Sequence, residues 1–158
     1  MFNAVCLRRF QASDFPHLIE LFRATVHRVC SRDYTPEQVQ AWAPDEVNLA
    51  RWQTLAERFT IVAEINDRIA GFADLEPDGH IDRFFVHAEF QGIGVGRAML
   101  FELVAEAKRI GVPRLYAEVS ITAQAFFERH GFEVLLEQIV VVGEVELTNY
   151  RMERWLKP

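Results

Sequence analysis

The chain has 158 residues, of which 50% are hydrophobic and 25% are charged. A chain of this length buries roughly 70% of its unfolded surface, so we expect one domain over residues 1–158 that folds without disulfides or metals. The composition excludes a disordered tail, a collagen-like repeat and a coiled coil. Seventeen basic and 23 acidic residues give a net charge of −6. Nonspecific binding to nucleic acid depends on Lys and Arg at phosphates, so nucleic acid is not an expected partner.

The two cysteines and the hydropathy indicate the cellular compartment in which the protein is expected. Cys6 and Cys30 match no metal-site spacing and no disulfide framework. We interpret both as small buried hydrophobic residues in a reducing compartment, with no metal. No stretch approaches the ~20 apolar residues of a membrane span. The N-terminus lacks the pattern of a cleaved leader, so a cytoplasmic protein that binds no membrane is expected.

The front of the chain is predicted as a strand followed by helices. Alternation around residues 5–7 indicates a short strand. Apolar residues then recur at helical spacing from Phe15 to Val26, behind Ser13 as an N-cap. Thr35-Pro36-Glu37-Gln38 predicts a second helix that begins with a capping box. Another helical stretch follows Pro44.

From Phe59 onward the apolar period is two. Phe59–Ile65, Asn66-Asp67 and Arg68–Leu75 read as a strand, a tight turn and a strand, which is the pattern of a hairpin. The later elements are predicted as a strand at His80–Val86, a helix through Met99 and Ala107, a strand at Arg114–Val119, a helix at Thr122–His130, and strands at Phe132–Val142 and Val145–Met152. The order β-α-α-β-β-β-α-β-α-β-β predicts an α/β fold (α+β in some schemes) with a mixed sheet and helices on both faces.

The most informative segment is Q-G-I-G-V-G-R, at residues 91–97, between a strand and a helix. Backbone N–H groups at such a helix start form an anion site suited to phosphate. Its glycines present no Cβ, and Arg97 adds a cation. A dinucleotide fingerprint needs a small residue where Arg97 or Met99 stands, and a P-loop needs a Lys, so neither motif fits. A glycine-rich connection without a ligand is the alternative.

These residues resemble the GNAT superfamily of acyl-CoA N-acyltransferases. Gln91–Gly96 is similar to its Q/R-x-x-G-x-G/A pyrophosphate loop. The preceding F-F-V, at residues 84–86, and A-F-F-E-R-H-G-F, at residues 125–132, look like its two core motifs in the right order. The segments Y-T-P-E-Q-V-Q-A-W-A and T-N-Y-R-M also resemble the YafP-like branch.

The resemblance implies a GNAT-like fold and acetyl-CoA as cosubstrate, with pantetheine between the strands at His80–Val86 and Arg114–Val119. Main-chain groups of residues 84–86 would pair with pantetheine amides, and amides of residues 92–97 would bind the pyrophosphate. The cosubstrate residues that it implies are Phe84, Phe85, Val86, Gln91, Gly92, Ile93, Gly94, Val95, Gly96, Arg97, Ser120 and Phe127.

Acetyl transfer to a primary amine by direct attack needs a general base. A lysine-like amine has a pKa of ~10.4, so about one molecule in a thousand is nucleophilic at neutral pH. Asp82 and Glu118 lead as candidates because their strands flank the proposed gap, ahead of Asp74, Glu76 and His80. For each of them a solvated acid or imidazole at a strand end is the alternative.

One position departs from the family. Many GNAT enzymes carry a Tyr, which protonates or hydrogen-bonds the leaving sulfur, where this chain has Phe127. Water, Ser120 or Tyr150 is the expected substitute. A non-catalytic acyl-CoA sensor or interaction module is therefore the alternative function.

The segment at residues 33–57 faces the substrate in this superfamily. It carries Asp33, Glu37, Asp45, Glu46 and Glu57 against a single Arg51. Acids on a pocket wall would attract a cationic amine, whereas a solvated helical face is the alternative. We expect a small-molecule or peptide amine as the substrate and allow for a homodimer.

Overall fold

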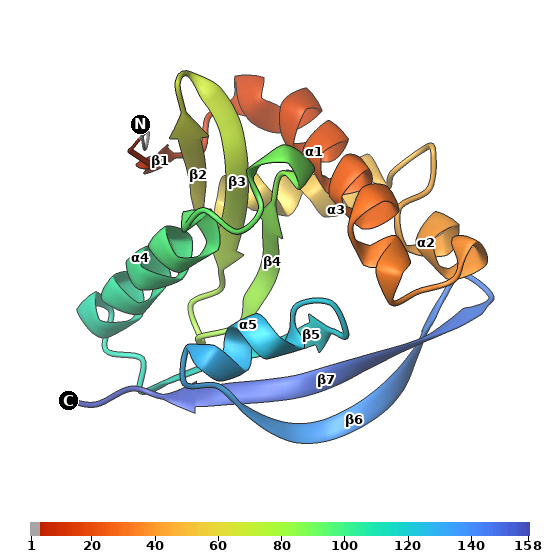
Figure 1. The fold of residues 1–158 in the computed structure, drawn as a ribbon. Helices are drawn as coiled ribbons and strands as arrows, with labels where there is room; N and C mark the ends of the chain where they lie inside the picture. The colour runs from red at the N-terminus through yellow and green to blue at the C-terminus, as the bar shows by residue number, and fades with distance from the viewer. Residues whose placement is uncertain (1–3) are drawn as a thin grey trace.

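The computed structural model describes residues 4–158, and its elements follow the predicted order (Figure 1). The strands are β1 (Cys6–Arg9), β2 (Phe59–Ile65), β3 (Arg68–Leu75), β4 (Ile81–Val86), β5 (Arg114–Ser120), β6 (Glu133–Val142) and β7 (Val145–Trp155). The helices are α1 (Phe15–Arg28), α2 (Pro36–Trp42), α3 (Leu49–Trp52), α4 (Val95–Arg109) and α5 (Gln124–Arg129). The four-residue α3 is the helical stretch expected after Pro44, and it continues into a 3-10 turn.

The strands divide into two sheets that meet at one point. One sheet has the order β1-β2-β3-β4 and the other β5-β7-β6, and all of their pairs are antiparallel. A parallel bridge between His80 and Tyr116 connects them. Figure 1 shows β4 and β5 leaving this junction in different directions. The predicted mixed sheet therefore takes the form of two antiparallel halves with a parallel contact between them.

Gly79 makes this junction possible. Its φ is +98°, and a Cβ built on it would lie 2.1 Å from the carbonyl oxygen of Arg114. The Tyr116 N–H donates to the Gly79 carbonyl at 3.1 Å. A side chain at this position would therefore push the two halves apart where their backbones touch.

Local signals place most element boundaries correctly. The capping box at the start of α2 is present, with Thr35 and Gln38 each accepting from the other's backbone N–H. Asn66 and Asp67 have φ values of 50° and 62°, as a tight hairpin turn requires. Ser13 is not the N-cap of α1. Asp14 is, and its carboxylate accepts from Arg8 and from the backbone N–H of Gln11.

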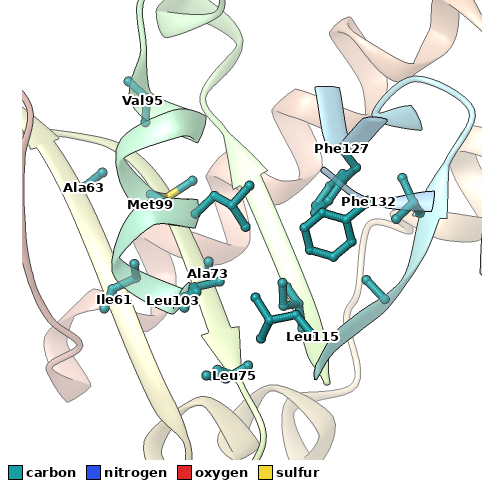
Figure 2. Packing of buried hydrophobic residues seen from close by; sticks show 14 of the residues in the cluster. Ile61, Ala63, Ala73, Leu75, Val95, Met99, Leu103, Leu115, Phe127 and Phe132 are labelled. Atoms are coloured by element: carbon teal, nitrogen blue, oxygen red, sulfur yellow. The ribbon is translucent and has the colours of Figure 1, made fainter. Parts of the chain in front are cut away.

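Helices cover both faces of the sheets, as predicted. On one face, Val95, Met99 and Leu103 of α4 pack on β2 and β3, and Phe127 of α5 lies beside Phe132 (Figure 2). On the other face, α1, α2 and α3 pack over a second cluster that contains Cys30. Cys6 is exposed, so the expectation of two buried cysteines is correct for Cys30 and wrong for Cys6.

Candidate active site

A cavity of about 1120 Å³ opens where β4 and β5 diverge. Most of the residues singled out from the sequence line it. They are His80, Asp82, Phe84, Phe85, Val86, Gln91, Gly92, Gly94, Val95, Gly96, Arg97, Glu118, Ser120 and Phe127. Ile93 and Tyr150 are not lining residues, and the Ile93 side chain is exposed.

The glycine loop has the geometry of an open anion site. Gly92 and Gly94 have positive φ angles, and no heavy atom lies within 4 Å of a Cβ built on either. The first hydrogen bond of α4 runs from the Ala98 N–H to the Gly94 carbonyl. The N–H groups of residues 95–97 precede that bond, so they are the unpaired donors of the helix start. Together with the dipole of a 15-residue helix, they fit a phosphate group.

The edge of β4 that faces β5 is only partly free. The His87 N–H donates to the Ala70 carbonyl, so strand alternation turns the backbone of Phe85 toward β3 and those of Phe84 and Val86 toward β5. The Val86 carbonyl already accepts from Thr25 Oγ1 at 2.9 Å and from Gln91 Nε2 at 2.7 Å. The backbone of Phe84 and the Val86 N–H are the groups left to bind an extended ligand.

Asp82 is held by arginines. Its carboxylate lies 2.5 Å from Arg58 Nη1 and 3.7 Å from Arg83 Nη1. Burial works against ionisation, but the hydrogen bond from Arg58 and the charges of both arginines hold the pKa of Asp82 below its usual range. A carboxylate neutralised in this way is a weak proton acceptor.

Glu118 instead has an imidazole partner. His80 Nε2 lies 2.6 Å from the Glu118 carboxylate, while Nδ1 lies 3.4 Å from Glu76. The hydrogen bond from His80 lowers the pKa of Glu118. Burial opposes the charge on His80, but the hydrogen bond and the neighbouring carboxylates outweigh it and raise the pKa of His80 above 6.5. The pair therefore accepts a proton at the neutral imidazole of His80, while the Glu118 carboxylate stabilises the charge that forms.

The other predicted site residues are Ser120, Tyr150 and Phe127, and they differ in whether and how they contact the cavity. Ser120 lines the cavity and its Oγ accepts from the Ala123 N–H at 3.1 Å, which leaves its hydroxyl hydrogen free to donate. The Tyr150 hydroxyl lies 3.3 Å from Glu137 on β6. Phe127 is 3% exposed and packs edge-on against Phe84 and Phe132, so it belongs to both the cavity wall and the core.

The opposite wall is almost free of charge. The front helices and the β6–β7 hairpin contribute Thr25, Val29, Cys30, Tyr34, Trp42, Arg51, Val140, Val142, Leu147, Thr148 and Asn149. Arg51 is the one charged residue in this set. None of the five front acids lines the cavity: Asp33 accepts from Thr122, for example, and Asp45 pairs with Arg23. Of the two alternatives for the front acids, the structure contradicts the acidic pocket wall and agrees with the solvated helical face.

Two structural features of the site were left open or missed by the sequence. The Tyr34 hydroxyl donates to the Thr148 carbonyl at 2.6 Å and accepts from the Ile121 N–H at 2.9 Å, so it ties the front helices to β7 and to the end of β5. Arg58 contacts Asp74, Glu76 and Asp82. No local sequence pattern predicts the contacts of Tyr34 or Arg58, because their partners come together only through the tertiary fold.

Comparisons with known proteins agree with this architecture. Residues 30–154 match the family described as the acetyltransferase (GNAT) domain. The chain is 34% identical over 151 residues to the uncharacterized N-acetyltransferase YafP of Escherichia coli K12, covering 95% of each chain. A GCN5-related N-acetyltransferase from Rhodopseudomonas palustris superposes with a TM-score of 0.93 at 28% identity, over 99% of this chain and 98% of that one. YncA from Salmonella typhimurium, solved with its cofactor acetyl-CoA, shares the fold with a TM-score of 0.68 at 20% identity, over 98% and 95% of the two chains.

Within residues 4–158, no helix is long and apolar enough to cross a membrane, and no cluster of His, Cys, Asp and Glu side chains is arranged to hold a metal ion. The residues that match the family model, 30–154, include the glycine loop and both diverging strands. This chain belongs to the GNAT superfamily of N-acetyltransferases, in the branch that contains YafP, and is an acyltransferase.

Proposed function

We propose that this protein transfers the acetyl group of acetyl-CoA to a primary amine by direct attack. The observation that carries the proposal is one continuous cavity that joins an open phosphate-binding loop to a carboxylate–imidazole pair. The bound acetyl-CoA in the structure of YncA, which shares this fold, supports the same cosubstrate here.

The cosubstrate would lie along β4. The pyrophosphate would accept from the amides at the start of α4, and the pantetheine amides would pair with the free backbone groups of Phe84 and Val86. Gly92 and Gly94 leave room for this approach because a Cβ at either position would project into open space. Arg97, which lines the cavity at this end, would add a charge-assisted contact to the phosphates.

The Glu118–His80 pair would remove the proton that the ammonium group of the acceptor must lose. The neutral nitrogen then attacks the thioester carbonyl, the C–N bond forms, and the C–S bond breaks. The second nitrogen proton ends on the departing thiolate, through Ser120 or water. A thiol pKa of ~8.5 makes this thiolate a fair leaving group, so the proposed reaction does not require a tyrosine at position 127.

The test is thiol release from acetyl-CoA over a panel of amines, with acetyl-CoA affinity measured in parallel by isothermal titration. We expect amine-dependent release of coenzyme A in the native protein. Tight acetyl-CoA binding without release for any amine would instead support the second candidate, a non-catalytic acyl-CoA sensor, which the missing hydroxyl at Phe127 favours. Absence of acetyl-CoA binding would contradict both.

A cytoplasmic location and a homodimer stay predictions. For the dimer, the surface to test is the edge strand β6, where Ile139 and Val141 are each 65% exposed. Sedimentation of the native protein and of Ile139→Lys would reveal a dimer that depends on this edge. An unchanged monomer in both would contradict it.

A further inference from the structure

We propose that the acceptor is an amine that also carries an anionic group, as an amino acid carries a carboxylate, and that Arg51 binds this group. The inference rests on the proposed acetyl transfer and names the chemical class of its acceptor. It starts from the cavity-lining residues that have ionisable side chains, which are Arg51, His80, Asp82, Arg97, Glu118, Arg129 and His130.

Most of these charges already have a partner or a place at the cosubstrate end. Asp82 is paired with Arg58, and Glu118 with His80. His130, at the end of α5, lies against Phe126, whose ring lies 3.1 Å from the Cβ position of Gly96 in the glycine loop. The end of α5, which carries Arg129 and His130, therefore lies beside the glycine loop, on the side of the phosphates. The charge that remains unmatched in the rest of the cavity is that of Arg51.

Arg51 is anchored by its backbone, and the residue is exposed. Its carbonyl accepts from Arg83 Nη2 and from Thr54 Oγ1, both at 2.7 Å, and this fixes α3 against β4 beside Asp82. Within residues 4–158, no carboxylate lies within 4.0 Å of its guanidinium. A planar guanidinium with unused donors binds a carboxylate through two parallel hydrogen bonds.

The rest of this wall defines the body of the acceptor. Tyr34, Trp42, Val140 and Leu147 line it without another charge. An acceptor that places its amine near Glu118 and its carboxylate at Arg51 would bring an apolar or aromatic body against these side chains. A purely cationic amine would find no unpaired acid on this wall and would meet the positive charge of Arg51.

The test is equilibrium titration of ligand pairs that differ only in the carboxylate. Leucine with isoamylamine, and phenylalanine with phenethylamine, are titrated into protein saturated with coenzyme A. We expect each amino acid to bind about tenfold tighter than its amine, equivalent to about 1.4 kcal/mol. Arg51→Gln should abolish this difference and Arg51→Lys should keep part of it. Lys157→Gln removes one exposed positive charge outside the cavity, so it should leave the difference unchanged.

Several results would overturn the inference: equal or tighter binding of the amines, an unchanged ratio in Arg51→Gln, or no binding of either amino acid. These results are distinct from failure of the proposed function, which would appear as absent thiol release with every amine. Thiol release that prefers the decarboxylated amines would leave acetyl transfer standing and remove Arg51 from its role.

Discussion

The two walls of the cavity are built in different ways. The cosubstrate wall is built mainly from one continuous stretch, residues 84–97, whose backbone N–H and carbonyl groups are its proposed contacts, with Phe127 of α5 beside it. The acceptor wall is assembled from α1, α2, α3 and the β6–β7 hairpin, and offers side chains. In Figure 1 the end of this hairpin lies beneath α2, and Gln38 binds the Glu146 carbonyl there. A backbone site depends on local turns, whereas a side-chain site depends on the packing of the whole chain.

The base between the two walls should give the largest effect. Glu118→Gln removes the carboxylate of the proton-accepting pair but keeps its shape, so the rate should fall by roughly 10²–10⁴ while acetyl-CoA affinity stays constant. Asp82→Asn is the matched control, because Asp82 is already neutralised by Arg58, and it should cost far less activity. Initial thiol-release rates decide between them. Equal losses in the two variants would show that the base has been misassigned.

The cosubstrate wall can be broken at Gly94. Gly94→Glu places a carboxylate and bulk in the open loop, so acetyl-CoA affinity should fall about 100-fold or more. Gly111→Glu is the matched control, since Gly111 also has a positive φ and open space but ends α4 far along the chain from the loop. Isothermal titration measures both. Unchanged affinity in Gly94→Glu would remove the loop from the binding site.

A substitution at Phe127 tests whether this residue of the cosubstrate wall is also part of the hydrophobic core. Because its ring packs against Phe84, Phe126 and Phe132, Phe127→Tyr should lower the free energy of unfolding by about 1–3 kcal/mol through an unpaired hydroxyl. Phe101→Tyr makes the same change on a side chain that is 76% exposed and should leave the melting temperature unchanged. A stable Phe127→Tyr variant with a faster rate would instead place the new hydroxyl at the leaving sulfur.

The smallest effect concerns pH. The pair accepts a proton only when His80 is neutral, and the pKa of His80 is raised above 6.5, so the rate should fall as the pH drops through that raised value. In His80→Gln the acceptor is Glu118 alone, with an ordinary carboxyl pKa of ~4.3, so the acid limb of the rate profile should move to lower pH. An acid limb at the same pH in His80→Gln and in the native protein would show that His80 does not take part in proton removal.

The same contrast explains what the sequence could predict. The glycine loop, the Thr35 capping box and the Asn66-Asp67 turn are local patterns, and each is found where it was expected. The charge of the acceptor wall was left open, because the sequence shows that acids are present but not which way they face. Likewise, the sequence does not separate Asp82 from Glu118 as the candidate base. The two differ in their partners, Arg58 and His80, which lie 24 and 38 residues away along the chain.

The central claim is that both walls are occupied at once and that the amine attacks the thioester directly. Initial rates over a grid of acetyl-CoA and amine concentrations test it, because a ternary complex gives intersecting double-reciprocal lines and an acetylated enzyme gives parallel ones. Cys30 is the cavity thiol that an acetyl-enzyme would use, but burial raises its pKa to about 11 and makes it a poor nucleophile. We therefore predict intersecting lines. Parallel lines, together with acetylation of Cys30 in the absence of amine, would contradict direct transfer.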